Sequence, residues 1–376
     1  MTMSQNAESN HIVMLNKAYP PWVGGIERHV RDISEALVER GWPVSVLVCN
    51  ESNYNKTEIL NGVNVVRVPR LATCLSQPIV RGFFPKLREL KPALVHVHVP
   101  FPLGWFAPRF IPRDVPLVCS WHSDIIRQRF LHWVYGPFEQ RFLDRCNRIL
   151  PTSLPLMEHS SALSAYKDKC RVLPLAVHEE SFPAETMEPV TQRYEQGYSR
   201  PIVLFVGRLV GYKGLEYLVR AMESIEANLL IAGFGPQRSA LEKMAERLAP
   251  NRVHFLGHVS EEEKTALYRL ADVFVLPSVE RSEAFGYVLL EAMQQGCPVI
   301  TTDLPTGVKY VNQHGQTGLV VPPRDVKALA EAIQTLLSNK ETRQHFAKAA
   351  QDRVKQEFEF QSIIERLETE YRDLLK

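Results

Sequence analysis

HIVMLNKAYPPWVGGIERHV (residues 11–30) decides the expected fold, because it joins a buried strand to a helix through a loop with two adjacent glycines. Its first part, HIVMLN (11–16), is a short apolar run, and the residues from Ile26 to Arg40 have the spacing of an amphipathic helix. More short apolar runs follow in the first half of the chain: VSVLVC (44–49), VNVVRV (63–68), LVHVHV (94–99), PLVCSW (116–121) and RILP (148–151). Apolar strands separated by helices are typical of a parallel sheet that is covered on both faces.

The same pattern begins again in the second half of the chain. Strands are expected at PIVLFVG (201–207) and then at 228–233, 253–257, 273–277 and 298–302, with helices between them. We therefore predict an α/β protein with two Rossmann-like, doubly wound domains that face a central cleft. The domains cover residues 1–184 and 201–354, a polar segment bounded by prolines (185–200) is the expected linker, and a C-terminal helix (355–376) could pack back on the N-terminal domain.

Composition and charge limit the classes of function. The chain has 376 residues, of which 45% are hydrophobic, so most of it is expected to fold. A net charge of +2 lacks the basic excess of a protein that binds nucleic acid, and a small-molecule substrate is expected instead. The six cysteines form no C-x-x-C pair, which argues against a zinc site or a disulfide framework and favours a reducing cytoplasm. Neither a signal peptide nor a membrane span is expected, because the N-terminus is polar and no run approaches ~20 apolar residues.

Two loops that join a strand to a helix are candidates for binding an anion. Gly24 and Gly25 let the backbone approach an anion at a helix N-terminus, although a plain turn could use the same glycines. In GRLVGYKG (207–214), Arg208 and Lys213 project two cations from a glycine-containing loop, which suits a diphosphate; the alternative is a solvated turn. GFGPQR (233–238) matches a dinucleotide-binding fingerprint only in part, so a redox cofactor is disfavoured.

The segment SVERSEAFGYVLLEAMQQGCPVI (278–300) carries two carboxylates that are separated by seven residues. Glu283 is expected in a loop at a helix N-terminus and Glu291 more than a turn further along, on the same side. They could accept hydrogen bonds from sugar hydroxyls on either side of a phosphate, or they could be two surface glutamates of an amphipathic helix. His122 follows a predicted strand at the cleft, whereas His96 and His98 alternate with valines and are interpreted as packed histidines at the edge of the core.

Together these residues resemble the retaining GT-B glycosyltransferases of family 4 over nearly the whole chain. The motifs Y-P-P-x-x-G-G-I-E-R-H-V (19–30), G-R-L-x-x-x-K-G (207–214), E-A-F-G-x-x-x-x-E (283–291) and TGLVVPPRD (317–325) occur in that order. The resemblance implies that the C-terminal domain binds a nucleotide sugar and that the N-terminal domain binds the acceptor. No D-x-D motif occurs, so we expect no bound metal ion and no cofactor, and Arg208 with Lys213 would balance the charge of the diphosphate.

The resemblance also implies a role for each motif residue. Arg208 and Lys213 would hold the donor diphosphate and stabilise the leaving nucleotide, as preorganised cations do for charge that develops during a reaction. Glu283 would bind hydroxyls of the transferred sugar, and His122 would contact that sugar near the reacting carbon. The remaining expected contacts are Glu291 with the ribose, the backbone of Phe285 and Gly286 with the phosphates, Val259 and Lys264 with the base or its ribose, Gly25 with the diphosphate, and Gly24 and Gly25 with the acceptor.

Donor and acceptor are also expected from the resemblance, which is strongest to bacterial enzymes that build lipopolysaccharide O-chains. The donor would be GDP-mannose or GDP-D-rhamnose, and the acceptor an undecaprenyl-diphosphate-linked saccharide at the cytoplasmic face of the inner membrane, where other polysaccharide-assembly enzymes could be partners. The basic and aromatic stretches 79–91 and 126–145 would contact anionic lipid or hold the lipid diphosphate. A UDP-sugar donor, a sugar-nucleotide 2-epimerase of GT-B-like fold and a non-catalytic sugar-binding protein remain as alternatives.

Overall fold

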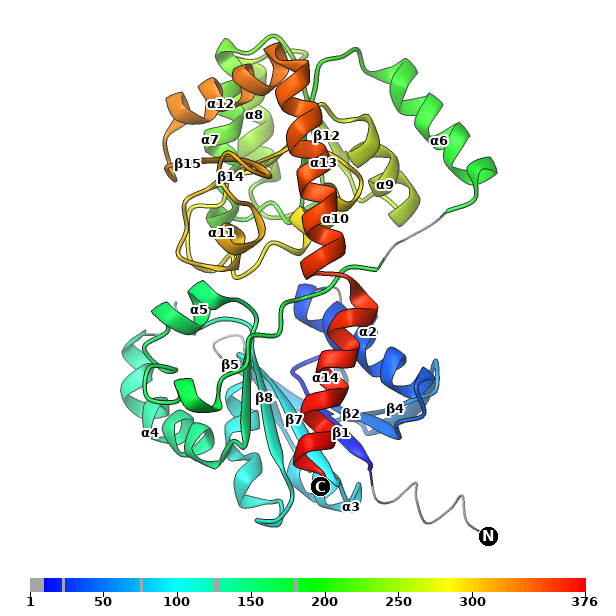
Figure 1. Ribbon diagram of the computed structural model, residues 1–376, viewed down its shortest axis with the longest axis vertical. Helices are drawn as coiled ribbons and strands as arrows, with labels where there is room; N and C mark the ends of the chain where they lie inside the picture. Colours follow the sequence, from blue (N-terminus) through cyan, green and yellow to red (C-terminus); the bar gives the residue numbers. More distant parts are fainter. Residues whose placement is uncertain (1–9, 22–23, 75–76, 125–128, 179–181) are drawn as a thin grey trace. The chain divides into compact units, whose positions relative to one another are not determined.

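The computed structural model describes residues 10–21, 24–74, 77–124, 129–178 and 182–376, and the chain forms two compact units (Figure 1). Unit 1 contains Met1–Leu175 and Gln361–Lys376, and unit 2 contains Ala176–Phe360. Among the described residues, no helix is long and apolar enough to span a bilayer.

Unit 1 is built on a seven-stranded sheet of order β3-β4-β2-β1-β7-β8-β9. The six parallel strands are β1 (Ile12–Leu15), β2 (Val44–Cys49), β4 (Val63–Val68), β7 (Leu94–Val99), β8 (Leu117–Trp121) and β9 (Arg148–Pro151). Without the antiparallel edge strand β3 (Lys56–Leu60), their order is that of a Rossmann fold, in which ligands bind beyond the carboxyl ends of the strands where the order reverses. In unit 1 this reversal lies between β1 and β7.

Helices and a separate hairpin complete unit 1. They are α2 (Gly25–Glu39), α3 (Phe83–Glu89), η1 (Pro102–Arg109), α4 (Arg129–Arg145), α5 (Leu154–His159), η2 (Lys167–Lys169), α14 (Phe360–Leu374) and the hairpin of β5 (Arg70–Cys74) with β6 (Gln77–Val80). The last helix, α14, is held on this unit by buried polar contacts. Trp42 Nε1 donates to the buried Glu368 carboxylate at 2.7 Å, and Tyr371 Oη lies 2.5 Å from His96 Nδ1. The C-terminus is therefore part of the first unit.

Unit 2 has a six-stranded parallel sheet of order β12-β11-β10-β13-β14-β15, again the Rossmann order. Its strands are β10 (Ile202–Val206), β11 (Asn228–Ala232), β12 (Val253–Gly257), β13 (Val273–Leu276), β14 (Val299–Thr302) and β15 (Gly318–Val321). Its helices are α6 (Ala184–Gly197), η3 (Gly211–Lys213), α7 (Leu215–Ala221), η4 (Met222–Ser224), α8 (Arg238–Leu248), α9 (Glu261–Leu270), α10 (Tyr287–Gln294), α11 (Gly307–Val311), α12 (Val326–Ser338) and α13 (Lys340–Glu357). The reversal of strand order lies between β10 and β13.

The prediction of two doubly wound Rossmann-like domains is confirmed, but the linker is wrong. Residues 185–200 lie mostly in helix α6 of unit 2. Met187 and Tyr194 are buried, and the Arg193 guanidinium binds Glu263 of α9. Two apolar residues seven positions apart are enough to hold a polar helix here, and composition alone does not distinguish such a helix from a solvated linker.

The observed units also differ from the predicted boundaries at residues 184 and 354. Unit 1 ends its first segment at Leu175, and the chain returns to it at Gln361. Within the described part of the chain, four strands were not predicted: β3, β5, β6 and β15. In β3, KTEIL, three residues are exposed and two are half-buried, because an edge strand needs no continuous apolar run.

Candidate functional site

In unit 2, the loop between β10 and α7 is held against its neighbours by glycines. At Gly214, φ is +67°, and an added Cβ atom would lie 2.1 Å from the carbonyl oxygen of Pro277, which follows β13. At Gly233, φ is +140°, and an added Cβ would lie 1.9 Å from the oxygen of Gly207. Only glycine fits such close backbone approaches. The loop that carries Arg208 and Lys213 is therefore fixed beside the carboxyl ends of β10 and β13.

Lys213 and Glu283 form a buried ion pair at this edge of the sheet. Lys213 Nζ lies 2.6 Å from Glu283 Oε2, and each residue is 7% exposed. Ser278 Oγ donates to the same carboxylate oxygen at 2.7 Å. Burial acts to lower the pKa of Lys213, but Glu283 and Tyr212 outweigh it and raise the pKa above its ordinary value. Lys213 is therefore a permanent cation at neutral pH.

Arg208 is exposed and close enough to Lys213 for its charge to oppose protonation of the lysine. The structure thus brings three of the predicted residues, Arg208, Lys213 and Glu283, to one edge of the unit 2 sheet. An exposed guanidinium beside a buried ammonium can bind a diphosphate, since the first can approach a ligand and the second supplies a fixed positive charge.

Phe285 and Gly286 form the turn into helix α10. Gly286 has φ of +78°, and an added Cβ would lie 2.9 Å from Leu276 Cδ2. Phe285 is buried, and its ring lies 6.1 Å from that of Phe358. The amide of Gly307 donates to the carbonyl of Ala284 at 2.8 Å. The turn is therefore rigid, with the first amides of α10 at the carboxyl edge of the sheet, but its predicted contact with phosphate stays a prediction.

Glu291, a buried residue of α10, belongs to a second ion pair. Its carboxylate accepts hydrogen bonds from Lys264 Nζ at 2.8 Å and from Tyr268 Oη at 3.0 Å. Burial and the adjacent Glu291 raise the pKa of Tyr268 well above its ordinary value, so its hydroxyl remains a donor. The half-buried Val259 precedes the capping residue Ser260 of α9. Glu283 and Glu291 are thus buried and each paired with a different lysine, which excludes the alternative of two surface glutamates.

In unit 1, Gly24 and Gly25 begin helix α2. Gly24 is the N-cap residue, and an added Cβ there would lie 2.0 Å from Glu27 Oε2. Gly25 is exposed, and apart from its chain neighbours and the backbone of α2 itself, no described atom lies within 4 Å of where its Cβ would be. The helix therefore begins with an open position at Gly25, while its predicted contact with the diphosphate is not tested by these distances.

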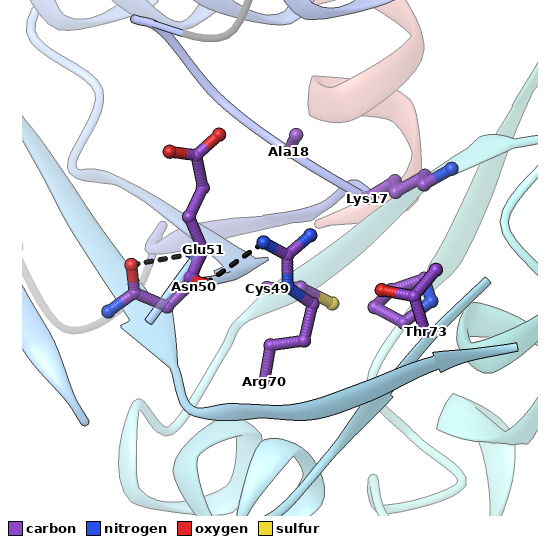
Figure 2. Close-up of a pocket in the computed structure, with 8 residues that line it drawn as sticks. Lys17, Ala18, Cys49, Asn50, Glu51, Arg70 and Thr73 are labelled. Atoms are coloured by element: carbon purple, nitrogen blue, oxygen red, sulfur yellow. Dashed lines mark hydrogen bonds between the residues drawn. The ribbon is translucent and has the colours of Figure 1, made fainter. Parts of the chain in front are cut away.

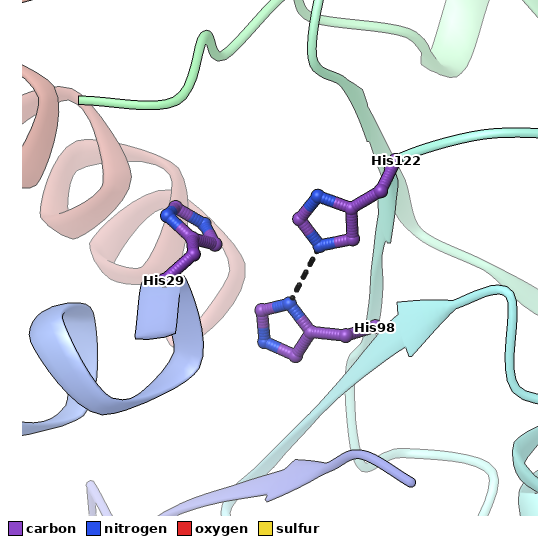
Figure 3. Close-up of side chains that lie close together, drawn as sticks. All are labelled: His29, His98 and His122. Atoms are coloured by element: carbon purple, nitrogen blue, oxygen red, sulfur yellow. Dashed lines mark hydrogen bonds between the residues drawn. The ribbon is translucent and has the colours of Figure 1, made fainter. Parts of the chain in front are cut away.

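Three imidazole rings converge beside the carboxyl ends of β7 and β8 (Figure 3). His122 follows β8, His98 lies on β7 and His29 lies on α2, and all three are buried. His98 Nδ1 lies 3.1 Å from His122 Nε2, and the His29 and His122 ring centroids are 5.3 Å apart. Burial lowers the pKa of His29 to about 4 and the pKa values of His98 and His122 well below their ordinary range. The rings are therefore neutral at pH 7.

Sequence reasoning found this group only in part. The prediction that His96 and His98 share one face and lie in the core is confirmed, since both are buried and their ring centroids are 4.3 Å apart. His29 lies in the quoted glycine motif but was assigned no role. Its neighbours in space, His98 and His122, lie 69 and 93 residues away along the chain, so no local pattern indicates the contact.

A pocket of about 260 Å³ in unit 1 was also missed by the sequence analysis. Lys17 and Ala18 follow β1, Cys49 ends β2, and Arg70 and Thr73 come from the β5–β6 hairpin (Figure 2). Arg70 donates from Nη2 to the backbone oxygen of Glu51 at 2.9 Å, which holds the guanidinium at the pocket wall. Two cations thus line a pocket beyond the carboxyl ends of β1 and β2.

The basic and aromatic stretches 79–91 and 126–145 do not present all of their rings. Phe83 and Phe142 are buried, and Phe84 stacks on Phe110 with ring centroids 4.0 Å apart. These rings hold α3, α4 and η1 in place, so the expectation that they settle at a lipid surface is wrong for them. Residues 125–128, and the side chains of 129–134, lie outside the described part of the chain.

Both halves of the chain match known families. A family model for glycosyltransferase family 4 matches residues 23–181, and a model for glycosyl transferases group 1 matches residues 190–353. The chain is 35% identical over 342 residues to the D-rhamnosyltransferase WbpZ of Pseudomonas aeruginosa, which covers 89% of this chain and 88% of that protein. It is 29% identical over 360 residues to the O-antigen chain mannosyltransferase C of Escherichia coli, and the match covers 95% of this chain and 96% of that protein.

Solved structures of other proteins have the same fold over nearly the whole chain. A sucrose-phosphate synthase from Thermosynechococcus elongatus has a TM-score of 0.79 and 25% identity over 97% of this chain and 99% of its own. HepE of Anabaena, in complex with UDP-glucose, has a TM-score of 0.79 and 19% identity, and the match covers 96% of this chain and 99% of the HepE chain. The two Rossmann-like sheets and these matches agree over nearly the whole length. The chain belongs to the family 4 glycosyltransferases of the GT-B fold and is a hexosyltransferase.

Proposed function

We propose that this enzyme is a retaining α-hexosyltransferase of O-antigen assembly. It would transfer mannose or D-rhamnose from a GDP-sugar to an undecaprenyl-diphosphate-linked saccharide. Two relatives support this choice of sugar and pathway, since one is a D-rhamnosyltransferase and the other an O-antigen chain mannosyltransferase. The observation that carries the proposal is the buried Lys213–Glu283 pair at the reversal of strand order in unit 2.

The donor's diphosphate would bind at Arg208 and Lys213. Breaking the bond between the sugar and the diphosphate builds negative charge on the leaving nucleotide, and fixed cations stabilise that charge without reorganisation. Lys213 is held in place by Glu283, whose carboxylate would accept hydrogen bonds from hydroxyls of the transferred sugar. Because Arg208 and Lys213 supply the positive charge that balances the diphosphate, we expect transfer to need no metal ion and to continue in EDTA.

Glu291 would bind the ribose of the donor, with its position set by Lys264 and Tyr268. In unit 1, His122 would contact the transferred sugar near its reacting carbon. Retention of configuration follows from the family resemblance, with front-side attack within an ion pair as its course. Proton NMR of the product distinguishes an α from a β linkage and tests the retention directly.

The acceptor's anionic group is proposed to bind in the pocket between Lys17 and Arg70. A diphosphate beside these cations would leave the saccharide end of the acceptor beyond the carboxyl ends of β1 and β2. An Arg70→Ala variant should raise the KM for a diphosphate-linked acceptor about 10-fold or more, on the scale of one charged hydrogen bond, with little change in the KM for the donor.

Peripheral contact with the cytoplasmic face of the inner membrane is proposed for the β5–β6 hairpin. Leu71 and Ile79 are 60% and 49% exposed on this hairpin, next to Arg70 and the exposed Arg81. Apolar and basic side chains together favour anionic bilayers. Sedimentation with vesicles rich in anionic lipid at low salt should retain the protein, and a Leu71→Ser/Ile79→Ser variant should remain in solution; equal retention of both would contradict this surface.

The decisive experiment is transfer by the purified enzyme from each of a set of GDP-, UDP-, ADP- and dTDP-sugars to a synthetic polyprenyl-diphosphate saccharide. We expect product from GDP-mannose or GDP-D-rhamnose, and loss of about 100-fold or more in rate for Arg208→Ala. Product from UDP-sugars alone would overturn the choice of donor. Conversion of UDP-GlcNAc without an acceptor would instead indicate an epimerase, and failure to turn over any nucleotide sugar would favour a non-catalytic sugar-binding protein.

A further inference from the structure

We propose that His29, His98 and His122 bind one divalent transition-metal ion of borderline softness, with Zn²⁺ as the best fit. One ring nitrogen from each residue lies within 4.8 Å of the other two. The three rings come from α2, β7 and the end of β8, which are all elements of unit 1 (Figure 3). The site is therefore built entirely within one compact unit.

Burial makes this group unlike a set of surface histidines. His29 is 4% exposed, His98 is 1% exposed and His122 is 3% exposed. The ring nitrogens His98 Nε2 and His122 Nδ1 are buried and have no hydrogen-bond partner among the described residues. The metal ion would bind the two nitrogens that face each other, His98 Nδ1 and His122 Nε2, so these two outer nitrogens would carry the ring protons and would not be ligands.

The hydrogen bond between the two rings leaves a bare nitrogen whichever ring donates. If His98 Nδ1 carries the proton, His98 Nε2 has a lone pair that accepts no hydrogen bond from any described group. If His122 Nε2 carries the proton instead, His122 Nδ1 has such a lone pair. A metal ion can replace this shared proton, which then moves to the other nitrogen of the same ring. Binding would therefore need no net loss of a proton from the pair.

The distances agree with a tetrahedral site. Zn–N bonds of about 2.0–2.1 Å in a tetrahedron place two ligand nitrogens about 3.3 Å apart. His98 Nδ1 and His122 Nε2 are 3.1 Å apart, so these two rings are already at the required separation. The third ring, of His29 on α2, also has a nitrogen within 4.8 Å of the other two ligand atoms.

The donor set selects the metal. Three imidazole nitrogens without a carboxylate suit Zn²⁺, Co²⁺, Ni²⁺ or Cu²⁺, whereas Mg²⁺ and Ca²⁺ prefer oxygen ligands. The missing D-x-D motif argues only against a metal ion on the donor diphosphate, so it does not bear on this site. A fourth position would remain open, as in sites with three protein ligands.

Occupation of the site would inhibit sugar transfer, and this consequence rests on the proposed function. His122 would be a metal ligand, so it would no longer be available to the transferred sugar. Added Zn²⁺ should then reduce the transfer rate, and EDTA should restore it. If no donor supports transfer, the proposed function fails, while direct measurement of metal binding still decides whether the site exists.

The test is titration of the full-length, EDTA-treated and desalted protein with Co²⁺ and Zn²⁺. Visible absorption of the Co²⁺ complex should show tetrahedral imidazole coordination at one equivalent, without the near-ultraviolet charge-transfer band of cobalt thiolate. His29→Gln and His98→Gln should each weaken Zn²⁺ binding in calorimetry by more than about 100-fold, the upper range for loss of a mere supporting partner. The matched control is His159→Gln, at an exposed histidine of α5 in the same unit, and it should bind normally.

Two results would overturn the proposal. One is equal Zn²⁺ affinity of the wild-type protein and of both cluster variants. The other is sulfur ligation in the X-ray absorption spectrum of the Zn²⁺-loaded wild-type protein, where three imidazoles are expected. The second measurement needs no variant, so it decides the question even if a cluster variant fails to fold.

Discussion

Replacing Lys213 by Met would leave the Glu283 carboxylate buried without its counter-ion. The two side chains are 2.6 Å apart and nearly inaccessible, and only the Ser278 hydroxyl remains as a described donor to Glu283. Removing one partner of such a pair costs about 3–5 kcal/mol of stability. For a unit of this size, each kcal/mol shifts the midpoint of thermal unfolding by about 2–4 °C, so we expect a loss of about 6–20 °C.

The double variant Lys213→Met/Glu283→Gln separates stability from catalysis. It removes both charges and keeps the approximate volume of both side chains, so most of the lost stability should return. Activity should not return, because the cation proposed to stabilise the leaving diphosphate is absent from both variants. We expect transfer rates reduced about 100-fold or more in each, measured with saturating donor at a temperature where both are folded.

The control is Lys309→Met, which breaks the exposed pair with Asp303 (2.8 Å apart, both residues more than half exposed). An exposed pair contributes less than about 1 kcal/mol, so neither stability nor rate should change measurably. If Lys213→Met is as stable as this control, the pair is not buried as described. If the double variant transfers sugar at the wild-type rate, positive charge at Lys213 is not needed.

Three further predictions concern the polar side chains Lys264, His29 and Glu368. Lys264→Met should raise the KM for the donor about 10-fold with a smaller effect on kcat in initial-rate measurements, because Glu291 would lose its ammonium partner; an unchanged KM would contradict the ribose role. Since burial lowers the pKa of His29 to about 4 from 6.5, the unfolded chain takes up a proton below pH 6.5 before the folded chain does, and stability falls towards pH 4. The free energy of unfolding, measured with urea at pH 7, 6 and 5, should change with pH less steeply in His29→Gln than in the wild-type protein, by up to about 1.4 kcal/mol per pH unit. Equal slopes in the two proteins would mean that the His29 ring is solvated. Glu368→Ala should lower the free energy of unfolding by about 2–4 kcal/mol, since Trp42 Nε1 would lose its acceptor; a loss below about 0.5 kcal/mol would show that α14 does not depend on this contact.

Much of the fold was predictable because parallel strands buried on both faces are continuous apolar runs. VSVLVC and LVHVHV, for example, coincide with β2 and β7, in which every residue is buried. The strands that were missed, β3 and β15 among them, lie at the edges of their sheets, where one side has no neighbour. Helix α6 was missed because its burial depends on contact with α9, which a single segment does not reveal.

The candidate donor residues were also predictable, but their pairing was not. Arg208, Lys213, Glu283 and Glu291 belong to two motifs with recognisable spacing. Lys213 and Glu283 are 70 residues apart, and they meet because β10 and β13 are adjacent in the sheet. Only the strand order decides which loops share one edge.

By itself, the sequence determined that the chain folds as two α/β units and where the donor motifs lie, because hydrophobic periodicity and motif spacing are local properties of the chain. The tertiary structure decided which charges are buried together, that the last helix belongs to the first unit, and that His29 joins His98 and His122. A lone histidine has no local signature. Its ionisation and its ligands depend on what packing places around it and on how much water that packing removes.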